Sequence, residues 1–184
     1  MSGARAPLPL VPHPDHHAVA VRGIHVDVAR TPDALAATYA LDGDLDAIRI
    51  PPPAAPAIVH ALWEHTCFEL FVAADGAAAY HELNLSPSGA WAAFAFRGYR
   101  DGGPVADAAL APQIVARREA GRLVLDARVP LARLSPAYPG ARLRLALTAV
   151  VEDAHGRRSY WALRHPPGRP DFHHRDGFTL VLET

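Results

Sequence analysis

The sequence predicts an all-β fold: a two-sheet antiparallel β-sandwich of jelly-roll or immunoglobulin-like type. The first observation is that Leu123, Leu125, Ala127 and Val129 alternate with the polar residues Arg122, Asp126 and Arg128, and the second is a similar pattern of apolar residues at every other position over 142–151. A period of two is typical of a strand with one face on a core and one face in water. Short runs of this kind recur between turn signals, as in sandwiches and barrels. The residues expected to face the core include Leu123, Leu125, Leu143, Leu145 and Leu147.

Other segments resemble these two, and most are separated by glycine-containing turns. Asp75-Gly76, Asp101-Gly102-Gly103 and His155-Gly156 carry the glycine that tight turns use for positive φ. Pro51-Pro52-Pro53 cannot lie in a central strand and indicates a loop. Further strands are expected at 18–28, 45–50, 66–73, 78–86, 91–98, 158–164 and 177–183.

The segment 31–41 has two conflicting signals. Thr31-Pro32-Asp33 is a good helix start, and the following stretch is rich in alanine. Leu35, Ala37, Tyr39 and Leu41 nevertheless alternate. We favour a strand at the sheet edge, paired with 45–50 through a turn at Asp42-Gly43.

Length and composition predict one globular domain. The chain has 184 residues, close to the roughly 100–200 of a single domain. We expect a flexible, Pro- and His-rich arm at 1–17 and a single domain at 18–184.

The net charge is −1, and no basic run or long apolar run occurs, so neither nucleic acid nor a membrane is an expected partner. The single cysteine, Cys67, excludes an internal disulfide, and residues 1–17 lack the apolar stretch of a signal peptide. We therefore expect a cytoplasmic protein.

Polar and aromatic side chains concentrate first at 62–91. Alternation places Tyr80, Glu82 and Asn84 on one face of a strand, and Glu69 on the corresponding face of the preceding strand. Aromatic faces cover the C–H surface of a sugar, while carboxylates and amides bond its hydroxyls. The alternative is an ordinary solvated sheet face beside core aromatics.

A second concentration lies at 159–174, where Pro and Gly mark a loop that could close over one end of a sandwich. Its candidate binding residues are Trp161, His165, Asp171, His173 and His174. With His65, the histidines raise the question of a metal site, but their spacing matches no known motif. The neighbouring residues His173 and His174 would point in opposite directions in an extended chain.

Evidence for catalysis in the sequence is weaker. Glu64, Glu69 and Glu82 offer carboxylate pairs that would suit glycoside hydrolysis. Ser86-Pro87-Ser88-Gly89 lacks the glycine before serine of a nucleophile elbow. Cys67 fits a buried, inert thiol.

Five sequence blocks resemble bacterial DOMON-like proteins related to carbohydrate-binding module family 9. The resemblance spans about residues 35–183, and its most specific block is the last. The blocks are "LWEHTCFELF", "AYHELNLSPSGAW", "FRGYR", "RLVLDARVPLARL" and "AVVEDAHGRRSYWALRHPPGRPDFHH".

This resemblance implies a β-sandwich with a sugar site in which tryptophans clasp the ring. Other DOMON domains bind haem through axial Met with His or Lys, but the sole methionine here is Met1, so haem would need two histidines. Arg100 ends the third block and joins the candidate ligand-binding residues. The residues on strands that match family 9 are Trp63, Glu69, Tyr80, Glu82, Asn84 and Trp91.

We therefore expect a non-catalytic module that binds a saccharide or sugar derivative and has no cofactor. A haem- or metal-binding domain with histidine ligation is one alternative, and an enzyme acting on a sugar derivative is another. The main structural expectation is that six residues converge on one pocket: Trp63, Glu69, Glu82, Asn84, His165 and His173.

Overall fold

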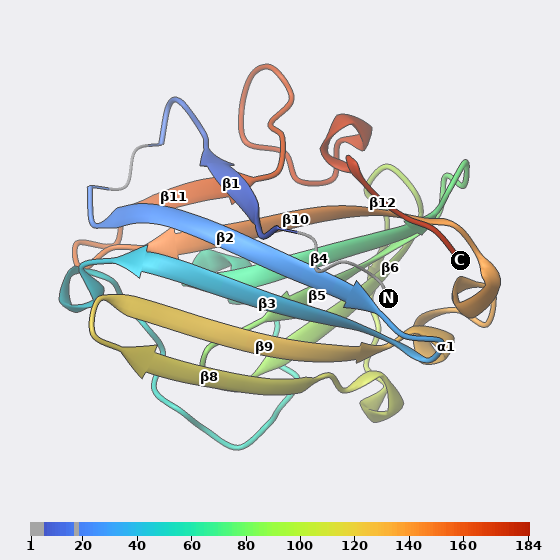
Figure 1. Cartoon of the computed structure of the whole chain (residues 1–184), viewed down its shortest axis with the longest axis horizontal. Helices are drawn as coiled ribbons and strands as arrows, with labels where there is room; N and C mark the ends of the chain where they lie inside the picture. The colour runs from blue at the N-terminus through green and yellow to red at the C-terminus, as the bar shows by residue number, and fades with distance from the viewer. Residues whose placement is uncertain (1–5, 17–18) are drawn as a thin grey trace.

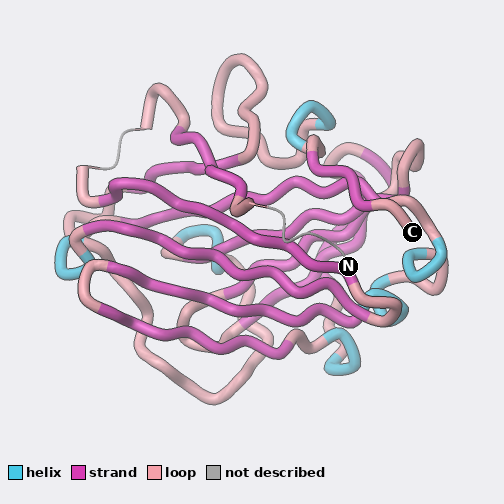
Figure 2. Tube along the Cα trace, in the orientation of Figure 1, coloured by secondary structure: helices cyan, strands magenta, loops and turns pink. Residues whose placement is uncertain are grey.

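The computed structural model describes residues 6–16 and 19–184. Nearly all of its regular structure is strand, as Figures 1 and 2 show. The strands are β1 (Leu8–Pro12), β2 (Val21–Arg30), β3 (Ala34–Gly43), β4 (Cys67–Ala74), β5 (Tyr80–Leu85), β6 (Trp91–Gly98), β7 (Asp101–Pro104), β8 (Gln113–Glu119), β9 (Arg122–Pro130), β10 (Leu143–Glu152), β11 (Arg158–Ala162) and β12 (Leu180–Leu182).

The helical pieces are each a single turn within the connections. They are α1 (Leu131–Leu134) and the 3₁₀ turns η1 (Leu45–Ala47), η2 (Leu62–Glu64), η3 (Ala108–Leu110), η4 (Tyr138–Gly140) and η5 (Arg175–Gly177). No helix in the described part of the chain is long and apolar enough to span a membrane.

The strands form two layers that share β1. The hydrogen-bonded order is β7-β6-β5-β4-β10-β11-β1-β2-β3-β9-β8, with β12 added beside β10. In Figure 1 the layer of β2, β3, β9 and β8 lies in front of the layer that contains β4, β5, β6 and β10. The prediction of an all-β sandwich is confirmed.

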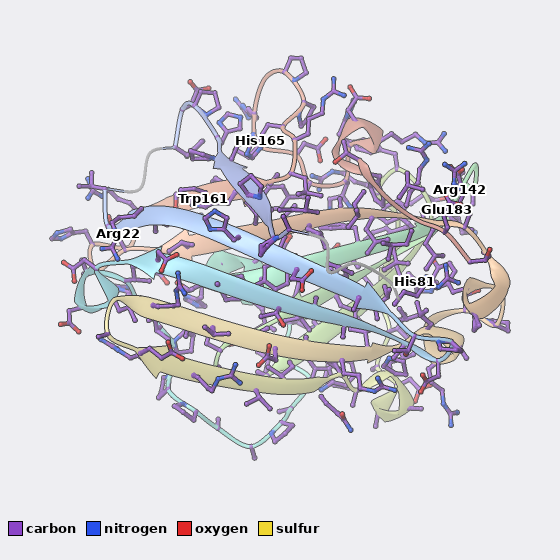
Figure 3. All side chains as sticks on the ribbon, viewed as in Figure 1. Arg22, His81, Arg142, Trp161, His165 and Glu183 are labelled. Atoms are coloured by element: carbon purple, nitrogen blue, oxygen red, sulfur yellow. The ribbon has the colours of Figure 1, made fainter. Side chains whose placement is uncertain are left out.

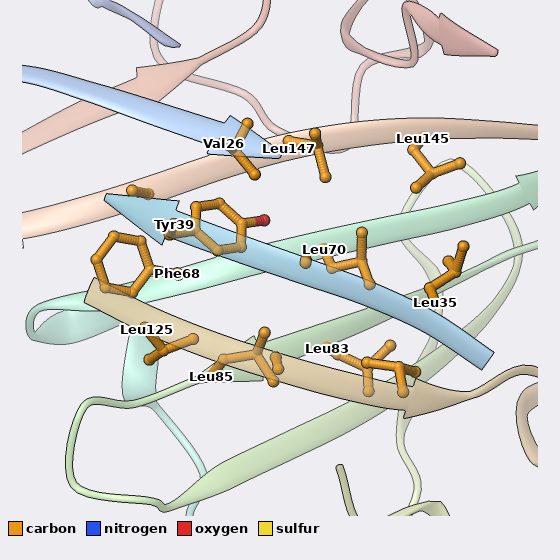
Figure 4. Packing of buried hydrophobic residues seen from close by; sticks show 14 of the residues in the cluster. Val26, Leu35, Tyr39, Phe68, Leu70, Leu83, Leu85, Leu125, Leu145 and Leu147 are labelled. Atoms are coloured by element: carbon orange, nitrogen blue, oxygen red, sulfur yellow. The ribbon is translucent and has the colours of Figure 1, made fainter. Parts of the chain in front are cut away.

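The core fills the space between these layers, as Figure 4 shows. The five leucines expected inside are all buried in it, at 2 % exposure or less. The hydroxyl of Tyr39 in β3 crosses the core and donates to the Glu69 carbonyl of β4 over 2.8 Å. Period-two alternation therefore assigned the inner faces correctly.

The strand expected within the segment 31–41 is present as β3, but its predicted edge position and its predicted partner are wrong. β3 is a central strand, paired with both β2 and β9. Residues 45–47 form η1 instead of a strand, and Ile48 makes only an isolated bridge to Asp153. The side chain of Asp44 accepts from the Asp46 amide and so begins this turn.

The segment expected to be a flexible arm contains a strand. Within residues 6–16, β1 pairs with β2 through Leu8–Leu10 and with β11 through Val11 and Pro12. Leu10 is buried at 4 % exposure, so apolar burial fixes this segment. Residues 1–5 and 17 of the predicted arm lie outside the described residues.

Leu10→Ala should lower the free energy of unfolding by about 2–4 kcal/mol, because it removes buried methyl groups from β1. Val11 is 46 % exposed, so the matched control Val11→Ala should change stability by less than about 0.5 kcal/mol. Urea denaturation of both variants measures the difference. Equal effects would mean that β1 does not contribute to the core.

Candidate functional site

The outer face of the β6-β5-β4-β10 sheet carries the candidate residues. The pairing of β4 with β5 places Glu69 opposite Asn84 and Phe71 opposite Glu82. The next strands add Phe94 beside Glu82, and Thr148 beside Glu69. Because side chains alternate along each strand, all of these point away from the leucine core.

This face is buried as well, because residues of the segment between β11 and β12 pack on it. Phe178 packs on Phe71 and Tyr80, and Phe172 lies 6.0 Å from the Tyr160 ring. Thr148 is 1 % exposed and Glu69 is 2 % exposed. The sheet is therefore covered on both sides, and a pocket remains between it and the covering segments.

The pocket has a volume of about 460 Å³ and is rich in aromatic rings. The polar groups of its lining residues are two carboxyls, one imidazole, two guanidiniums, the Tyr160 hydroxyl and the Trp63 indole N–H. The main lining residues are Trp63, Glu69, Phe71, Glu82, Phe94, Phe96, Arg100, Arg158, Tyr160, Phe172 and His173.

A chain of hydrogen bonds sets the orientation of His173. The Arg100 amide donates to the Tyr80 hydroxyl over 3.1 Å, and that hydroxyl lies 2.8 Å from His173 Nδ1. Burial lowers the pKa of His173 to about 4, so its ring is neutral at pH 7. With Tyr80 donating to Nδ1, the proton of the neutral ring is on Nε2.

The Nε2 atom of His173 lies 3.6 Å from the Glu82 carboxyl, too far for a direct hydrogen bond. A ligand hydroxyl or a water placed between them could bond to both. His173 and Glu82 therefore form a matched polar pair inside an aromatic pocket.

The two buried carboxyls are held in an unusual state. Burial, with the nearby Glu82 carboxyl as the next cause, raises the pKa of Glu69 to about 8. Burial also raises the pKa of Glu82 to about 7. Glu69 accepts hydrogen bonds from Thr148 Oγ1 at 3.0 Å and Cys67 Sγ at 3.7 Å. At pH 7 Glu69 is thus mostly protonated, and Glu82 is about half ionised.

Asn84 is fully buried, at 0 % exposure, and neither polar atom of its side chain has a hydrogen-bond partner among the described residues. Buried amides are normally paired, and leaving one unpaired costs about 1–3 kcal/mol. Asn84 lies directly opposite Glu69 on the neighbouring strand. Unpaired polar groups of this kind are a feature of binding sites that await a water or ligand.

Two residues at the pocket rim have left-handed backbones. Ala61, which precedes η2, has φ 62°, and Arg100 has φ 54°. For residues other than glycine this conformation costs about 1–2 kcal/mol. The first positions Trp63 over the pocket, and the second turns the Arg100 amide toward Tyr80. Strain is thus concentrated where the pocket is built.

Asp171 fixes the Arg100 side of the pocket. Its carboxylate accepts from Arg100 at 2.9 Å, from the Tyr99 hydroxyl at 2.6 Å and from the His173 amide at 3.1 Å. Asp171 does not line the pocket but anchors residues that do. Tyr80 likewise anchors a lining residue, because its hydroxyl bonds to His173.

Of the six residues expected to converge, the structure brings four to the pocket: Trp63, Glu69, Glu82 and His173. Asn84 is on the same face but beneath the surface. His165 is elsewhere: its Nε2 bonds to the Val11 carbonyl, and its ring packs on His13. Figure 3 labels it beside β1.

Several other candidates also lie outside the pocket. Trp91 and Trp161 face the leucine core, so they cannot clasp a ligand there. Alternation explains this, since Trp91 pairs with the inward-facing Leu85. His65 contacts Glu152 over 2.8 Å, and His174 accepts from the Asp176 amide at the start of η5.

Sequence reasoning missed several lining residues. Phe94 and Phe96 could have been found, because they follow Trp91 at odd spacing and so face the opposite side of β6. Arg158 and Tyr160 could not, because only the pairing of β11 with β10 brings them to this face. No group of three or more His, Cys, Asp or Glu side chains in metal-binding proximity occurs in the described ranges.

No family model and no curated protein matches the chain. Solved structures do. A candidate carbohydrate-binding protein from Bacteroides uniformis ATCC 8492 has a TM-score of 0.72 at 14 % identity, covering 94 % of this chain and 82 % of that one.

Two structures of family 9 carbohydrate-binding modules from Caldicellulosiruptor kristjanssonii are also similar. The one in complex with cellotriose has a TM-score of 0.50 at 12 % identity and covers 88 % of this chain and 75 % of that one. The one in complex with glucose has a TM-score of 0.48 at 13 % identity, covering 79 % and 69 %.

Glu69→Gln should make stability less dependent on pH. The folded pKa of about 8 exceeds the ordinary 4.5, so the folded protein binds the extra proton and loses stability as pH rises from 4.5 to 8. The slope from one such group is at most about 1.4 kcal/mol per pH unit. Denaturation at pH 5, 6.5 and 8 should show that the free energy of unfolding of the variant rises relative to that of the wild type as the pH increases.

The control is Glu119→Gln at an exposed position of β8, which should leave the pH dependence unchanged. Identical slopes for Glu69→Gln and the wild type would contradict a protonated Glu69.

Gly102→Ala should destabilise the rim of the pocket by about 1–3 kcal/mol, because its Cβ would lie 2.0 Å from the Ala95 carbonyl oxygen. At the adjacent Gly103 a Cβ meets nothing within 4 Å, so Gly103→Ala is the control. Thermal unfolding of both variants tests this. A stable Gly102→Ala protein would show that β7 can move without cost.

The geometry and the comparisons agree on the architecture, and we conclude that the chain has the β-sandwich fold of family 9 carbohydrate-binding modules.

Proposed function

We propose that the chain is a non-catalytic module that binds a saccharide or sugar derivative in the aromatic pocket above β4 and β5. The finer relation to DOMON-like proteins is part of this proposal. The observation on which it depends is the combination, in one pocket, of aromatic rings with the Glu82–His173 pair.

The shape and chemistry of the pocket suit a sugar. A volume of about 460 Å³ lies within the roughly 300–1,000 Å³ of small-molecule sites. The rings of Trp63 and Phe94, whose centroids are 5.8 Å apart, offer apolar faces to the C–H surface of a sugar ring. Glu82 and the Nε2–H of His173 then bond hydroxyl groups at the ring edge.

Solved structures with a similar fold support the same proposal. One similar structure is a candidate carbohydrate-binding protein, and another is a family 9 module solved with cellotriose. At 12–14 % identity these give the architecture. The choice of ligand class for this chain comes from the pocket.

A second candidate is an enzyme acting on a sugar derivative. It is favoured by one observation: burial raises the pKa of Glu69 to about 8 and of Glu82 to about 7, as in general acids. The enzyme proposal requires repeated conversion of a sugar derivative, whereas the binding-module proposal expects none. If any sugar derivative is converted repeatedly, and Glu69→Gln abolishes conversion while binding persists, the binding-module proposal is wrong.

Trp63→Ala should weaken sugar binding about 10- to 100-fold, the loss typical of an aromatic anchor. Trp63 is 40 % exposed, so the fold should survive. Trp63→Phe keeps a ring and should retain most of the affinity. Val59→Ala, at a 40 % exposed position of the same segment that does not line the pocket, is the control.

The measurement is a thermal-shift screen of neutral, acidic and phosphorylated monosaccharides, followed by calorimetry on the best ligand. A ligand at 100 times its Kd stabilises a protein by about 2.7 kcal/mol, which such a screen detects. Haem and divalent metals are included, and an absorption band or stabilisation with these alone would favour the ligation alternative. No response to any sugar would overturn the proposal.

A further inference from the structure

Arg158 is a cation at the pocket wall, and the acidic residue opposite it, Glu152, contacts other side chains. It lies in β11 directly opposite Glu152 of β10. Opposite charges in this position would normally pair. The Glu152 carboxylate instead contacts other residues: Oε1 accepts from Arg49 at 2.9 Å, and Oε2 lies 2.8 Å from His65 Nδ1. Among the residues that the structure describes, Arg158 makes no hydrogen bond or ion pair.

The other guanidinium in the pocket is in a different situation. Arg100 is paired with Asp171 at 2.9 Å and lies near β7, on the far side of the pocket from β11. Four strands separate β7 from β11 in the sheet, at about 4.8 Å per step. The two guanidiniums therefore mark opposite ends of the pocket, and the free one is Arg158.

Among the other lining residues, only Glu82 carries substantial negative charge at pH 7, and β4 and β10 separate its strand β5 from β11. Burial keeps Glu69 protonated, with a pKa of about 8, and brings the pKa of Glu82 to about 7. Burial keeps His173 neutral. The pocket thus presents one unpaired positive charge at its β11 end, beside the rings of Tyr160 and Phe172.

Building on the proposed saccharide-binding function, we infer that the ligand is a sugar with an anionic substituent, a carboxylate or a phosphate, which pairs with Arg158. The planar guanidinium matches either group with two parallel hydrogen bonds. The sugar ring then lies over Trp63 and Phe94, with its hydroxyls at the Glu82–His173 pair.

Calorimetry on the full chain tests this with three matched ligand sets: glucose, galactose and mannose, their uronic acids, and their 6-phosphates. We expect at least one anionic sugar to bind about tenfold or more tightly than its neutral parent, which is about 1.4 kcal/mol. The stronger of the acid and phosphate series identifies the anionic group. Raising the salt concentration should reduce the difference in affinity between the anionic sugar and its neutral parent.

The variants Arg158→Gln and Arg157→Gln separate a direct contact from general charge. Arg157 is the next residue, and its guanidinium is 2.7 Å from Asp153, outside the pocket. Arg158→Gln should reduce the affinity for the anionic sugar to about that of its neutral parent for the same variant. Arg157→Gln should preserve the preference.

Each other outcome overturns one statement. If neutral sugars bind as tightly as their anionic forms, the anionic-ligand inference is wrong and the saccharide proposal stands. If Arg157→Gln abolishes the preference as fully as Arg158→Gln, the contact is not at Arg158. If inorganic phosphate binds as tightly as the sugar phosphates, the site takes any anion. If no sugar binds, the saccharide proposal itself fails.

Discussion

The structure depends on covering the sheet of β4, β5 and β10 on both faces. The inner face packs on the leucine core, and the outer face lies under the segment between β11 and β12. The bond between Tyr80 and His173 ties that segment to the sheet, and the amide of Arg100 holds Tyr80 in turn. Without this cover the outer face would be an ordinary wet sheet surface. With it, polar side chains become buried and a pocket forms.

Burial of the outer face gives the carboxyls their chemistry. A carboxylate in a low-dielectric site takes up a proton unless a cation or several donors stabilise its charge. Glu69 has only Thr148 and Cys67 as donors, and the cation Arg100 is already paired with Asp171. The same arrangement that raises the pKa of Glu69 leaves the pocket short of negative charge. Stability and ligand preference are therefore linked through one buried group.

The pocket also concentrates features that reduce stability. Asn84 has an unpaired buried amide, and Ala61 and Arg100 have left-handed backbones. Each costs on the order of 1 kcal/mol or more, a large share of the roughly 5–15 kcal/mol that stabilises a domain. All three lie around the same cavity. Local rules of sequence and structure fail most often where a protein binds its ligand.

Alternation by itself determined the fold class, the five core leucines, and the shared face of Tyr80, Glu82 and Asn84, because side-chain direction in a strand follows from spacing alone. Odd spacing could also have placed Trp91 and Phe94 on opposite faces of β6, but which face lies on the core followed from the pairing of Trp91 with Leu85. Tertiary structure decided the rest. Long-range pairing makes β1 a strand, places β3 at the centre of its layer and moves His165 away from the pocket. Arg158 lies opposite Glu152, whose carboxylate contacts Arg49 and His65, and those two contacts join residues 103 and 87 positions apart in the sequence. Spacing within a strand is local information, whereas which strands meet depends on the packing of the whole chain.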